Sequence, residues 1–420
     1  MKKFAIIGGG QCGLHLAFGL LDRGHDVTLY NDRNPEQLLA SRIQSTAFLF
    51  NRTLEMERRL GLNFWEHEAP LGEGMLVDFR DPGGKSMLSV AGRLHEKSGQ
   101  ALDQRTKFAR WMQEFERRGG KLVIRTVSLD ELEQVAAEHT LTFIAAGKGA
   151  VNALFERDAE RSRHHTPPRQ LAALLLRGPK LLGERPWPKA DFRPLRFNFI
   201  MGVGEFFSLP FYTHTAGECR SFLFEARPGG PMDRFGDAAD GQEMLAVARQ
   251  VLREYAPDDA AHLEDAKLTD PNAWLKGAFT PTIRKPVGTL PSGRVVMGVG
   301  DTVCLNDPIA GQGANNASRM AEHLLQAISE AHGEGLDAAW IQSTFDAFWE
   351  NSASYTSAFS NLLLEPPGEA AMEVLGAAAR HREVADAFMA CFETPRDFWP
   401  WIDDRDAARQ FVARRVHDAA

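Results

Sequence analysis

The first 30 residues alternate between apolar runs and polar turns. An apolar run at 4–7 meets a glycine-rich turn at 8–13, apolar positions recur at helical spacing over 14–23, and a second apolar run follows at 26–30. Short apolar runs are typical of buried parallel strands, and the middle pattern is that of a helix with one apolar face. The pattern therefore predicts a strand–helix–strand unit.

Patterns of the same kind return later in the chain. Strand-like runs lie at 121–125, 141–145 and 294–299, and helical patterns lie at 41–62, at 107–118 and from residue 314 onward. The region between them has strand-like alternation at 171–176, 197–201, 205–209 and 221–225, and a helical pattern at 244–255. This second set favours a mostly antiparallel sheet.

The chain is therefore expected to be an α/β protein of three parts. The first is a discontinuous Rossmann-type domain of residues 1–70, 100–165 and 285–330, the second an inserted, mostly antiparallel β-sheet domain of residues 71–99 and 166–284, and the third a helical C-terminal region of residues 331–420. A chain of 420 residues is also too long for one ordinary core.

Composition narrows the function classes. The net charge of -8 argues against a nucleic-acid partner, because non-specific nucleic-acid binders are usually basic. The four cysteines share no CxxC spacing, so we expect neither a disulfide framework nor a metal site, which fits the cytoplasm. No apolar stretch approaches the roughly 18 residues of a membrane helix, so no membrane segment is expected.

The glycine turn carries the first chemical signature. Residues 8–13 read GGGQCG and match the GxGxxG pattern between a strand and a helix. Gly8 allows the tight turn, Gly10 lets the backbone approach a pyrophosphate, and Gly13 lets the helix pack closely on the strand. The backbone N–H groups that follow, from Gln11 and Cys12 onward, face the phosphates at a helix N-terminus. The turn predicts dinucleotide binding.

The end of the second strand departs from the usual pattern. An acidic residue is expected there to hold the ribose, but the sequence has Asn31, followed by Asp32 and Arg33. Asn31 still donates and accepts hydrogen bonds, and Arg33 either flanks the adenosine or belongs to a solvated surface turn. The departure weakens an interpretation as an NAD enzyme.

A second signature points to a flavin. Residues 298–301 read GVGD and end in Asp301, which suits a ribityl or ribose hydroxyl. The run Gly311–Asn315, which contains Gly313, Ala314 and Asn315, then opens a helix. The N-terminal amides of that helix are placed to stabilise negative charge on the pyrimidine edge of reduced flavin. An NAD dehydrogenase has no need of this second loop, so the predicted cofactor is FAD.

Taken together, GGGQCG near residue 8 and GD followed by DPIAGQGANNAS near residue 300 resemble the flavoprotein monooxygenases related to p-hydroxybenzoate hydroxylase. The block from 298 to 318 is most similar to the oxygenase component of the two-component styrene and indole monooxygenases, the group E flavoprotein monooxygenases. Further matching pieces lie at 31–33, 42–46, 103–105 and 146–148. The resemblance covers nearly the whole chain to about residue 400.

One difference from the single-component hydroxylases bears on the source of electrons. Those enzymes carry Asp-Gly after the strand near residue 145, whereas this chain continues through Gly147 as AAGKG. The resemblance then implies that FAD arrives as FADH2 from a separate NADH:flavin reductase. It also implies that a flavin C4a-hydroperoxide formed with O2 epoxidises an aromatic alkene such as indole or styrene.

The resemblance suggests residues around the flavin ring. Arg42 is expected to hold the pyrophosphate or ribityl region. Ser45, where styrene oxygenases have Asn, and Thr46 are expected beside the ring, the alternative being that they cap a helix running toward residue 62. Arg105 either reaches the FAD phosphates or ribose or is an ordinary surface arginine.

The substrate is expected to meet an apolar wall. Pro308 and Ile309 are assigned to it, and the candidates from the inserted sheet are Phe199, Met201, Phe207, Leu209, Phe211 and Phe222. Alternation along a strand turns only some of these inward. The alternative functions on the same fold are a single-component NAD(P)H-dependent aromatic hydroxylase, a flavin halogenase, or a flavin sensor. The protein is expected to be a monomer or homodimer.

Overall fold

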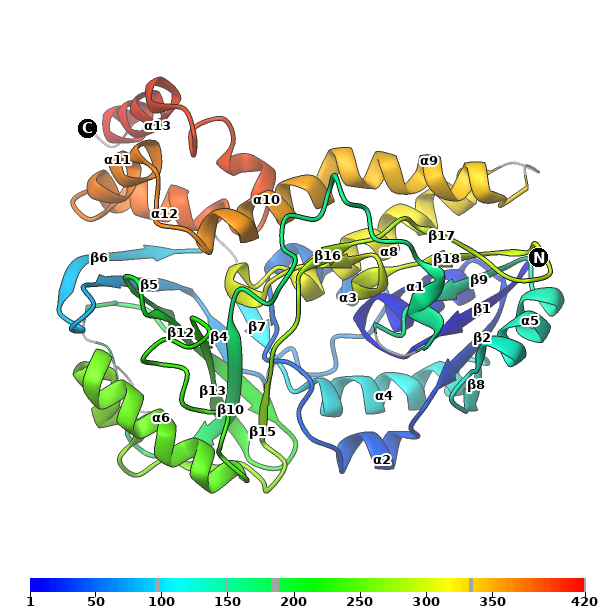
Figure 1. Cartoon of the computed structure of the whole chain (residues 1–420), viewed down its shortest axis with the longest axis horizontal. Coiled ribbons are helices and arrows are strands. Elements are labelled where there is room, and N and C mark those ends of the chain that lie inside the picture. The colour runs from blue at the N-terminus through cyan, green and yellow to red at the C-terminus, as the bar shows by residue number, and fades with distance from the viewer. Residues whose placement is uncertain (95–97, 148–149, 183–186, 188, 332–334, 419–420) are drawn as a thin grey trace.

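The computed structural model describes residues 1–94, 98–147, 150–182, 187, 189–331 and 335–418. Its strands form two main sheets, which lie side by side in Figure 1, and helices cover both. The two chain ends lie at opposite ends of the molecule, as Figure 1 shows. The predicted α/β class is confirmed.

The first sheet has six strands in the order β17-β18-β9-β1-β2-β8. Their bounds are β1 Lys3–Ile7, β2 Asp26–Asn31, β8 Lys121–Ile124, β9 Leu141–Ile144, β17 Val287–Thr289 and β18 Val295–Gly298. All neighbours are parallel except β17 and β18. The carboxyl ends of β1, β2, β9 and β18 therefore meet at one edge, where ligands bind in sheets of this kind.

Helices of the N-terminal half and α8 accompany this sheet. Their bounds are α1 Gln11–Asp22, α2 Pro35–Leu39, α3 Asn51–Arg59, α4 Gln104–Arg117, α5 Leu129–Glu138 and α8 Gly313–Glu330. A hydrophobic core joins α1, α4 and α8 to the strands. Gly19 of α1 lies so close to Leu325 of α8 that a Cβ there would be 2.1 Å from that side chain. The helices α1 and α8 are thus packed face to face.

The second sheet has eight strands, with β14-β10-β13-β12-β11-β5-β6 in order and β15 also paired to β10. Their bounds are β5 Gly74–Arg80, β6 Ser86–Arg93, β10 Gln170–Arg177, β11 Pro194–Ile200, β12 Gly204–Thr213, β13 Gly217–Ala226, β14 Lys267–Leu268 and β15 Trp274–Gly277. In the part of the chain that the structure describes, only β11 and β5 are parallel in this sheet, so the sheet is mostly antiparallel, as predicted.

The two faces of the second sheet are covered differently. On one face Phe206, Phe222 and Phe224 pack under α6 (Gly241–Tyr255), which is followed by α7 (Pro257–Ala260) and a 3₁₀ turn at Ala261–Leu263. On the other face Phe207 and Phe211 pack toward the C-terminal helices. Of the predicted pocket residues, Phe222 thus lies on the α6 face, away from Phe207, Leu209 and Phe211.

The C-terminal region is helical. It comprises α9 Ala338–Phe348, a π-helical turn at Trp349–Ala353, α10 Ser354–Leu363, α11 Glu369–Ala378, α12 Arg382–Ala390, a 3₁₀ turn at Pro395–Phe398 and α13 Arg405–Asp418. In Figure 1, α9 lies over the first sheet and α11–α13 over the second. Phe398 and Trp401 are buried there among Phe388 and Phe392, which is packing within the tail.

Short elements complete the chain and include one departure from the sequence prediction. The short strands are β3 Phe48–Leu49, β4 Leu71–Gly72, β7 Gly99–Ala101, β16 Thr282–Ile283 and β19 Cys304–Leu305, and the short 3₁₀ helices are η1 Ala150–Leu154, η3 Gly300–Thr302 and η4 Pro308–Ala310. The helical pattern expected over 41–62 was wrong for residues 41–50. Residues 48–49 form β3 and residues 41–47 have no regular secondary structure, because contacts with distant residues hold this segment.

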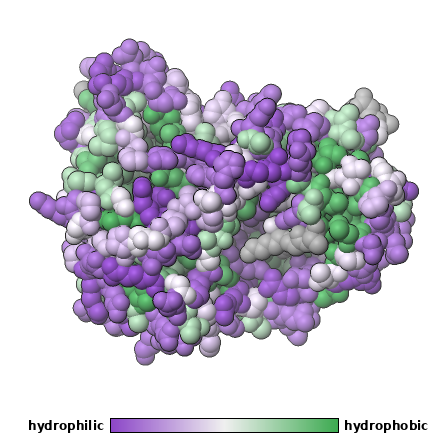
Figure 2. All heavy atoms as spheres, viewed as in Figure 1, coloured by the Kyte–Doolittle hydropathy of each residue, from purple (hydrophilic) through white to green (hydrophobic). Residues whose placement is uncertain are grey.

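The strands of the two sheets fall inside the ranges expected for the two domains, while the domain boundaries themselves stay a prediction. Figure 2 shows a face dominated by hydrophilic side chains, with hydrophobic ones in small separate groups. Within the described residues, no helix has the length and apolar character needed to cross a bilayer.

Candidate functional site

The glycine turn after β1 leaves no room for side chains at two of its positions. Gly8 has φ +114°, and its amide donates to the carbonyl of Tyr30 at 2.8 Å. A Cβ on Gly8 would lie 2.6 Å from the carbonyl oxygen of Ala145, and one on Gly13 would lie 2.0 Å from the carbonyl oxygen of Gly8. Both positions require glycine for close packing of backbone on backbone.

Gly10 differs from its neighbours because its free side faces open space. A Cβ placed there meets no protein atom within 4 Å. Gly10 is the N-cap of α1, and no side chain caps this helix end. The first backbone N–H groups of α1 are therefore left for another partner, and a helix N-terminus of this kind is suited to a phosphate.

The side chain of Asn31 braces this turn. Its oxygen accepts a hydrogen bond from the amide of Gly9 at 3.0 Å, and its nitrogen donates to the carbonyl of Arg33 at 2.7 Å. Asp32 is exposed, and Arg33 lies 3.4 Å from it. An aspartate at position 31 would have no N–H group to donate to the carbonyl of Arg33. This is a physical reason for asparagine at this position.

The second glycine motif lies against the first. Gly300 follows β18 with φ +58°, and a Cβ there would be 3.0 Å from the Cβ of Cys12. The exposed Asp301 lies next to Gly147, whose amide donates to the hydroxyl of Thr302 at 3.2 Å. The structure thus gathers the loops after β1, β9 and β18. The part of the 146–149 motif at 148–149 lies outside the described residues.

Cys12 is a packing residue at this junction. Burial, helped by the nearby negative charge of Asp301, raises the pKa of its thiol to about 12, although a hydrogen bond with the Gly300 backbone works in the other direction. The thiol therefore stays protonated at neutral pH and is a poor nucleophile.

Hydrogen bonds within the loop before α8 hold its shape. The carboxylate of Asp307 accepts a hydrogen bond from the amide of Ile309 at 3.1 Å, and the amide of Gly311 donates to the carbonyl of Pro308 at 2.8 Å. Gly311 has φ +63°, and neither it nor Gly313 has a neighbour on its open side. No side chain caps α8. This helix start, which includes the half-buried Ala314, is also accessible to a ligand.

Asn315 fastens this loop to the segment that was expected beside the ring. Its nitrogen donates to the carbonyls of Phe48 at 2.8 Å and Gly311 at 3.0 Å, and its oxygen accepts from the amide of Phe50 at 3.1 Å and the hydroxyl of Thr53 at 2.8 Å. All of its hydrogen-bonding capacity is used within the protein. Asn315 therefore acts here as a clamp.

Ser45 and Thr46 lie just before this clamp, half-buried in a segment without regular secondary structure. They cap no helix, since α3 starts at Asn51 with Phe50 as its N-cap. The clamp at Phe48 places these two residues near the start of α8. Pro308 and Ile309 form η4 on the adjoining loop.

The two arginines expected at the cofactor have protein partners. The guanidinium of Arg42 stacks 3.8 Å from the ring centre of Trp274. Arg105 is buried and bonds to Asp103 at 2.7 Å and to Asp270 at 2.8 Å, and it also donates to the carbonyl of Ser41. These contacts tie the 41–43 segment to the second sheet. Their cofactor roles stay predictions.

One buried hydrogen-bond network at this site has no signal in the sequence. The side-chain amide of Gln11 donates to Glu57 and to Ser318, each at 2.9 Å, and Glu57 also pairs with Lys107. These four residues come from α1, α3, α8 and α4 and lie far apart in the chain. Among the described residues, no group of three or more His, Cys, Asp or Glu is arranged to hold a metal.

Known proteins with similar sequences include styrene monooxygenases. Residues 147–262 match a family model described as the putative substrate binding domain of styrene monooxygenase A. The chain is 29% identical over 413 residues to styrene monooxygenase StyA of Pseudomonas fluorescens, an alignment that covers 95% of this chain and 94% of the relative.

Solved structures support the fold. The flavin-dependent brominase Bmp2 superposes with a TM-score of 0.62 at 14% identity, covering 99% of both chains. A 2-methyl-3-hydroxypyridine-5-carboxylic acid oxygenase superposes with a TM-score of 0.61 at 15% identity, covering 91% of this chain and 97% of that one. The chain thus has the fold shared by flavoprotein oxygenases and flavin-dependent halogenases. Within that fold, its sequence is similar to styrene monooxygenases, which agrees with the resemblance seen in the sequence.

Proposed function

We propose that this protein is the oxygenase component of a two-component flavoprotein monooxygenase, and that it epoxidises an aromatic alkene such as styrene or indole. Its cofactor is FAD, used in the reduced form and delivered by a separate reductase. The observation that carries the proposal is the contact of Gly300 with Cys12, which makes one site from the two flavin motifs.

The residues present fit an FAD molecule. The open side of Gly10 and the uncapped start of α1 suit the pyrophosphate. Asp301, in η3 directly after β18, suits a ribityl hydroxyl, and the uncapped start of α8 at Gly311 and Gly313 suits the electron-rich edge of the flavin. The turn at Asn31–Arg33 would then flank the adenosine.

When bound, reduced FAD supplies the activated oxygen through its reaction with O2. The protein's own task is to exclude water and to hold the double bond of the substrate. Ser45, Thr46, Pro308 and Ile309 would form the wall around the reacting atoms. The apolar side of the second sheet, at Phe207 and its neighbours, would hold the aromatic ring.

The test supplies reduced FAD and O2 to the purified protein together with styrene or indole, and identifies the products. We expect an epoxide from styrene and indigo-forming products from indole. A Gly10→Ala variant should lose flavin binding and product together. Gly236→Ala is the matched control, since Gly236 is exposed with no neighbour on its open side.

The other functions predict different results. Rapid flavin reduction by NADPH without a second protein would indicate a single-component hydroxylase. Halide-dependent chlorination or bromination of an aromatic ring would indicate a halogenase. Flavin binding without any oxygenated product would indicate a flavin sensor. Each of these outcomes would contradict the proposal.

A further inference from the structure

Two carboxyl groups meet in the interior between the second sheet and the loop that leads into η4. Glu225, on β13, has 0% of its surface exposed, and Asp307, directly before η4, has 3%. Among the described residues, no N–H or hydroxyl group donates to either oxygen of Glu225. The polar group that faces it is the carboxyl group of Asp307. Two such groups attract each other when one of them carries a proton.

The nearby cations do not neutralise this pair. Glu205, opposite Glu225 on β12, holds Arg169 through hydrogen bonds of 2.7 and 2.9 Å. Arg169 lies closest to Glu205, and the half-buried Arg227 also acts on that carboxylate. Among the described residues, three carboxyl groups therefore share a buried region with two arginines, and the hydrogen bonds of Arg169 go to Glu205 and to the carbonyls of Pro168 and Leu364.

Burial favours a bound proton in this region. Burial, with the negative charges of Asp307 and Glu205 added to it, holds the pKa of Glu225 well above its ordinary value. Burial also raises the pKa of Asp307, even though the amide of Ile309, Arg169 and His164 favour its ionised form. An ionised Glu225 would be a buried charge without a partner, which is costly.

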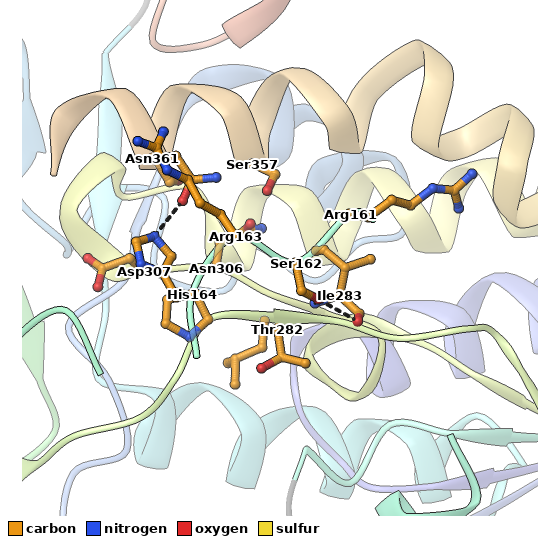
Figure 3. Close-up of a pocket in the computed structure, with 13 residues that line it drawn as sticks. Arg161, Ser162, Arg163, His164, Thr282, Ile283, Asn306, Asp307, Ser357 and Asn361 are labelled. Atoms are coloured by element: carbon orange, nitrogen blue, oxygen red, sulfur yellow. Dashed lines mark hydrogen bonds between the residues drawn. The ribbon is translucent and has the colours of Figure 1, made fainter. Parts of the chain in front are cut away.

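A polar pocket reaches Asp307 of this pair. Asp307 lines it together with His164, Asn306 and Asn361, as Figure 3 shows. The ring nitrogen Nε2 of His164 is 2.8 Å from the side-chain oxygen of Asn361, and the imidazole lies next to Asp307 in Figure 3. The pocket thus gives Asp307 a polar connection toward solvent.

We propose that Glu225 and Asp307 share one proton and exchange it with solvent through the pocket at His164, and that this pair delivers the proton that oxygenation consumes. The second half rests on the proposed function. Glu225 does not contact the substrate. It acts as a positioning residue, which holds the shared proton next to the 308–310 turn.

The proposed reaction consumes one proton, which the Glu225–Asp307 pair can supply. Anionic reduced flavin, O2, the alkene and one proton become oxidised flavin, the epoxide and one water, so each turnover takes one proton from the protein. That proton would leave the Glu225–Asp307 pair toward the substrate side of η4. A proton from the pocket would then return to Asp307 and restore the pair.

The first experiment detects the proton without any catalysis. Infrared spectra of the flavin-free protein at pH 7 should show the carbonyl band of a buried protonated carboxylic acid. The band should disappear in Glu225→Gln, which keeps the shape and neutrality of the protonated side chain. If wild type and variant have the same spectrum in this region, Glu225 is ionised and the proposal fails.

The second experiment follows exchange with solvent. In D2O the carbonyl band of wild type should shift rapidly as deuterium replaces the proton. In Asp307→Asn, which still accepts from the amide of Ile309, the shift should be slower by roughly tenfold or more. Asp346→Asn is the matched control, because Asp346 binds Arg161 on the same pocket but does not face the pair. Equal exchange in Asp307→Asn and wild type would overturn the role of the pocket.

The third experiment separates this inference from the proposed function. With externally supplied reduced FAD, Glu225→Gln should bind flavin like wild type but convert styrene about 100-fold more slowly, with an altered pH profile, since positioned proton transfer is worth factors of this order. Unchanged rate and pH profile would overturn the catalytic half. If wild type oxygenates no alkene, the proposed function fails, while the infrared result still decides the shared proton.

Discussion

The side-chain amide of Gln11 donates a hydrogen bond of 2.9 Å to the hydroxyl of Ser318 and so joins α1 to α8. These are the two helices whose uncapped N-termini are assigned to the two ends of FAD. The same amide holds the carboxylate of Glu57. Gln11 therefore sets the relative position of the two helix starts, a function that the GxGxxG pattern does not specify.

Replacing Gln11 with Leu should weaken both stability and flavin binding. The change removes the donor to the Ser318 hydroxyl and leaves Glu57 with Lys107 as its remaining buried donor, which costs about 1–3 kcal/mol. Chemical denaturation of the flavin-free protein measures the first effect, and titration with reduced FAD measures the second. The control is Gln326→Leu, because exposed Gln326 bonds only within α8. Equal effects in both variants would remove Gln11 from this role.

The parts of the fold that depend on local sequence pattern could be predicted from the sequence. The strand predicted at 26–30 is β2, and the glycine positions follow from backbone contacts that any such turn requires. The 41–50 segment was misjudged because its non-helical form depends on Asn315, far along the chain. Glu57 and the pairing of Glu225 with Asp307 could not be predicted either. Their contacts also join residues far apart in the chain, and no spacing in the sequence indicates such contacts.

Gly10 and Gly13 should respond oppositely to substitution by alanine. Gly13→Ala places a Cβ 2.0 Å from the carbonyl oxygen of Gly8, so the flavin-free protein should lose several degrees of melting temperature or fail to fold. Gly10→Ala meets no protein atom, so its stability should be within about 0.5 kcal/mol of wild type. Its FAD affinity should nevertheless fall by at least about tenfold, or about 1.4 kcal/mol.

Melting curves and flavin titrations on the same samples check this pair. A Gly10→Ala protein that binds FAD like wild type would show that the open side of Gly10 does not face the pyrophosphate. A stable Gly13→Ala protein would show that α1 tolerates a shift away from β1.

Arg105→Lys tests whether this arginine serves the cofactor or the fold. Lysine keeps the charge but cannot bind Asp103 and Asp270 through two parallel hydrogen bonds each, and each lost hydrogen bond to a charged group costs about 1.5–3 kcal/mol. We expect lower stability with FAD affinity of the folded protein within about twofold, or about 0.4 kcal/mol, of wild type. The exposed Arg125, paired with Glu131, provides the control Arg125→Lys. Normal stability with lost FAD affinity would instead support the cofactor role inferred from the sequence.

His15 should make the folded state sensitive to acid. Burial, together with the positive charges of Lys107 and Arg59, lowers its pKa from 6.5 to about 3. Between these values the unfolded chain binds a proton that the folded chain does not, so stability is complete above pH 6.5 and is lost as the pH falls toward 3. One such proton changes the free energy of unfolding by up to about 1.4 kcal/mol per pH unit.

His15→Met removes this proton while it keeps an apolar side chain of similar size in the core. Chemical denaturation from pH 7 to pH 4 should therefore show a shallower loss of stability for the variant than for wild type. His165→Met, at an exposed histidine, should keep the wild-type slope. Carboxylates that titrate in the same range act equally in all three proteins, so the difference between the slopes reports His15 alone. Identical slopes for His15→Met and wild type would mean that His15 is protonated in the folded protein.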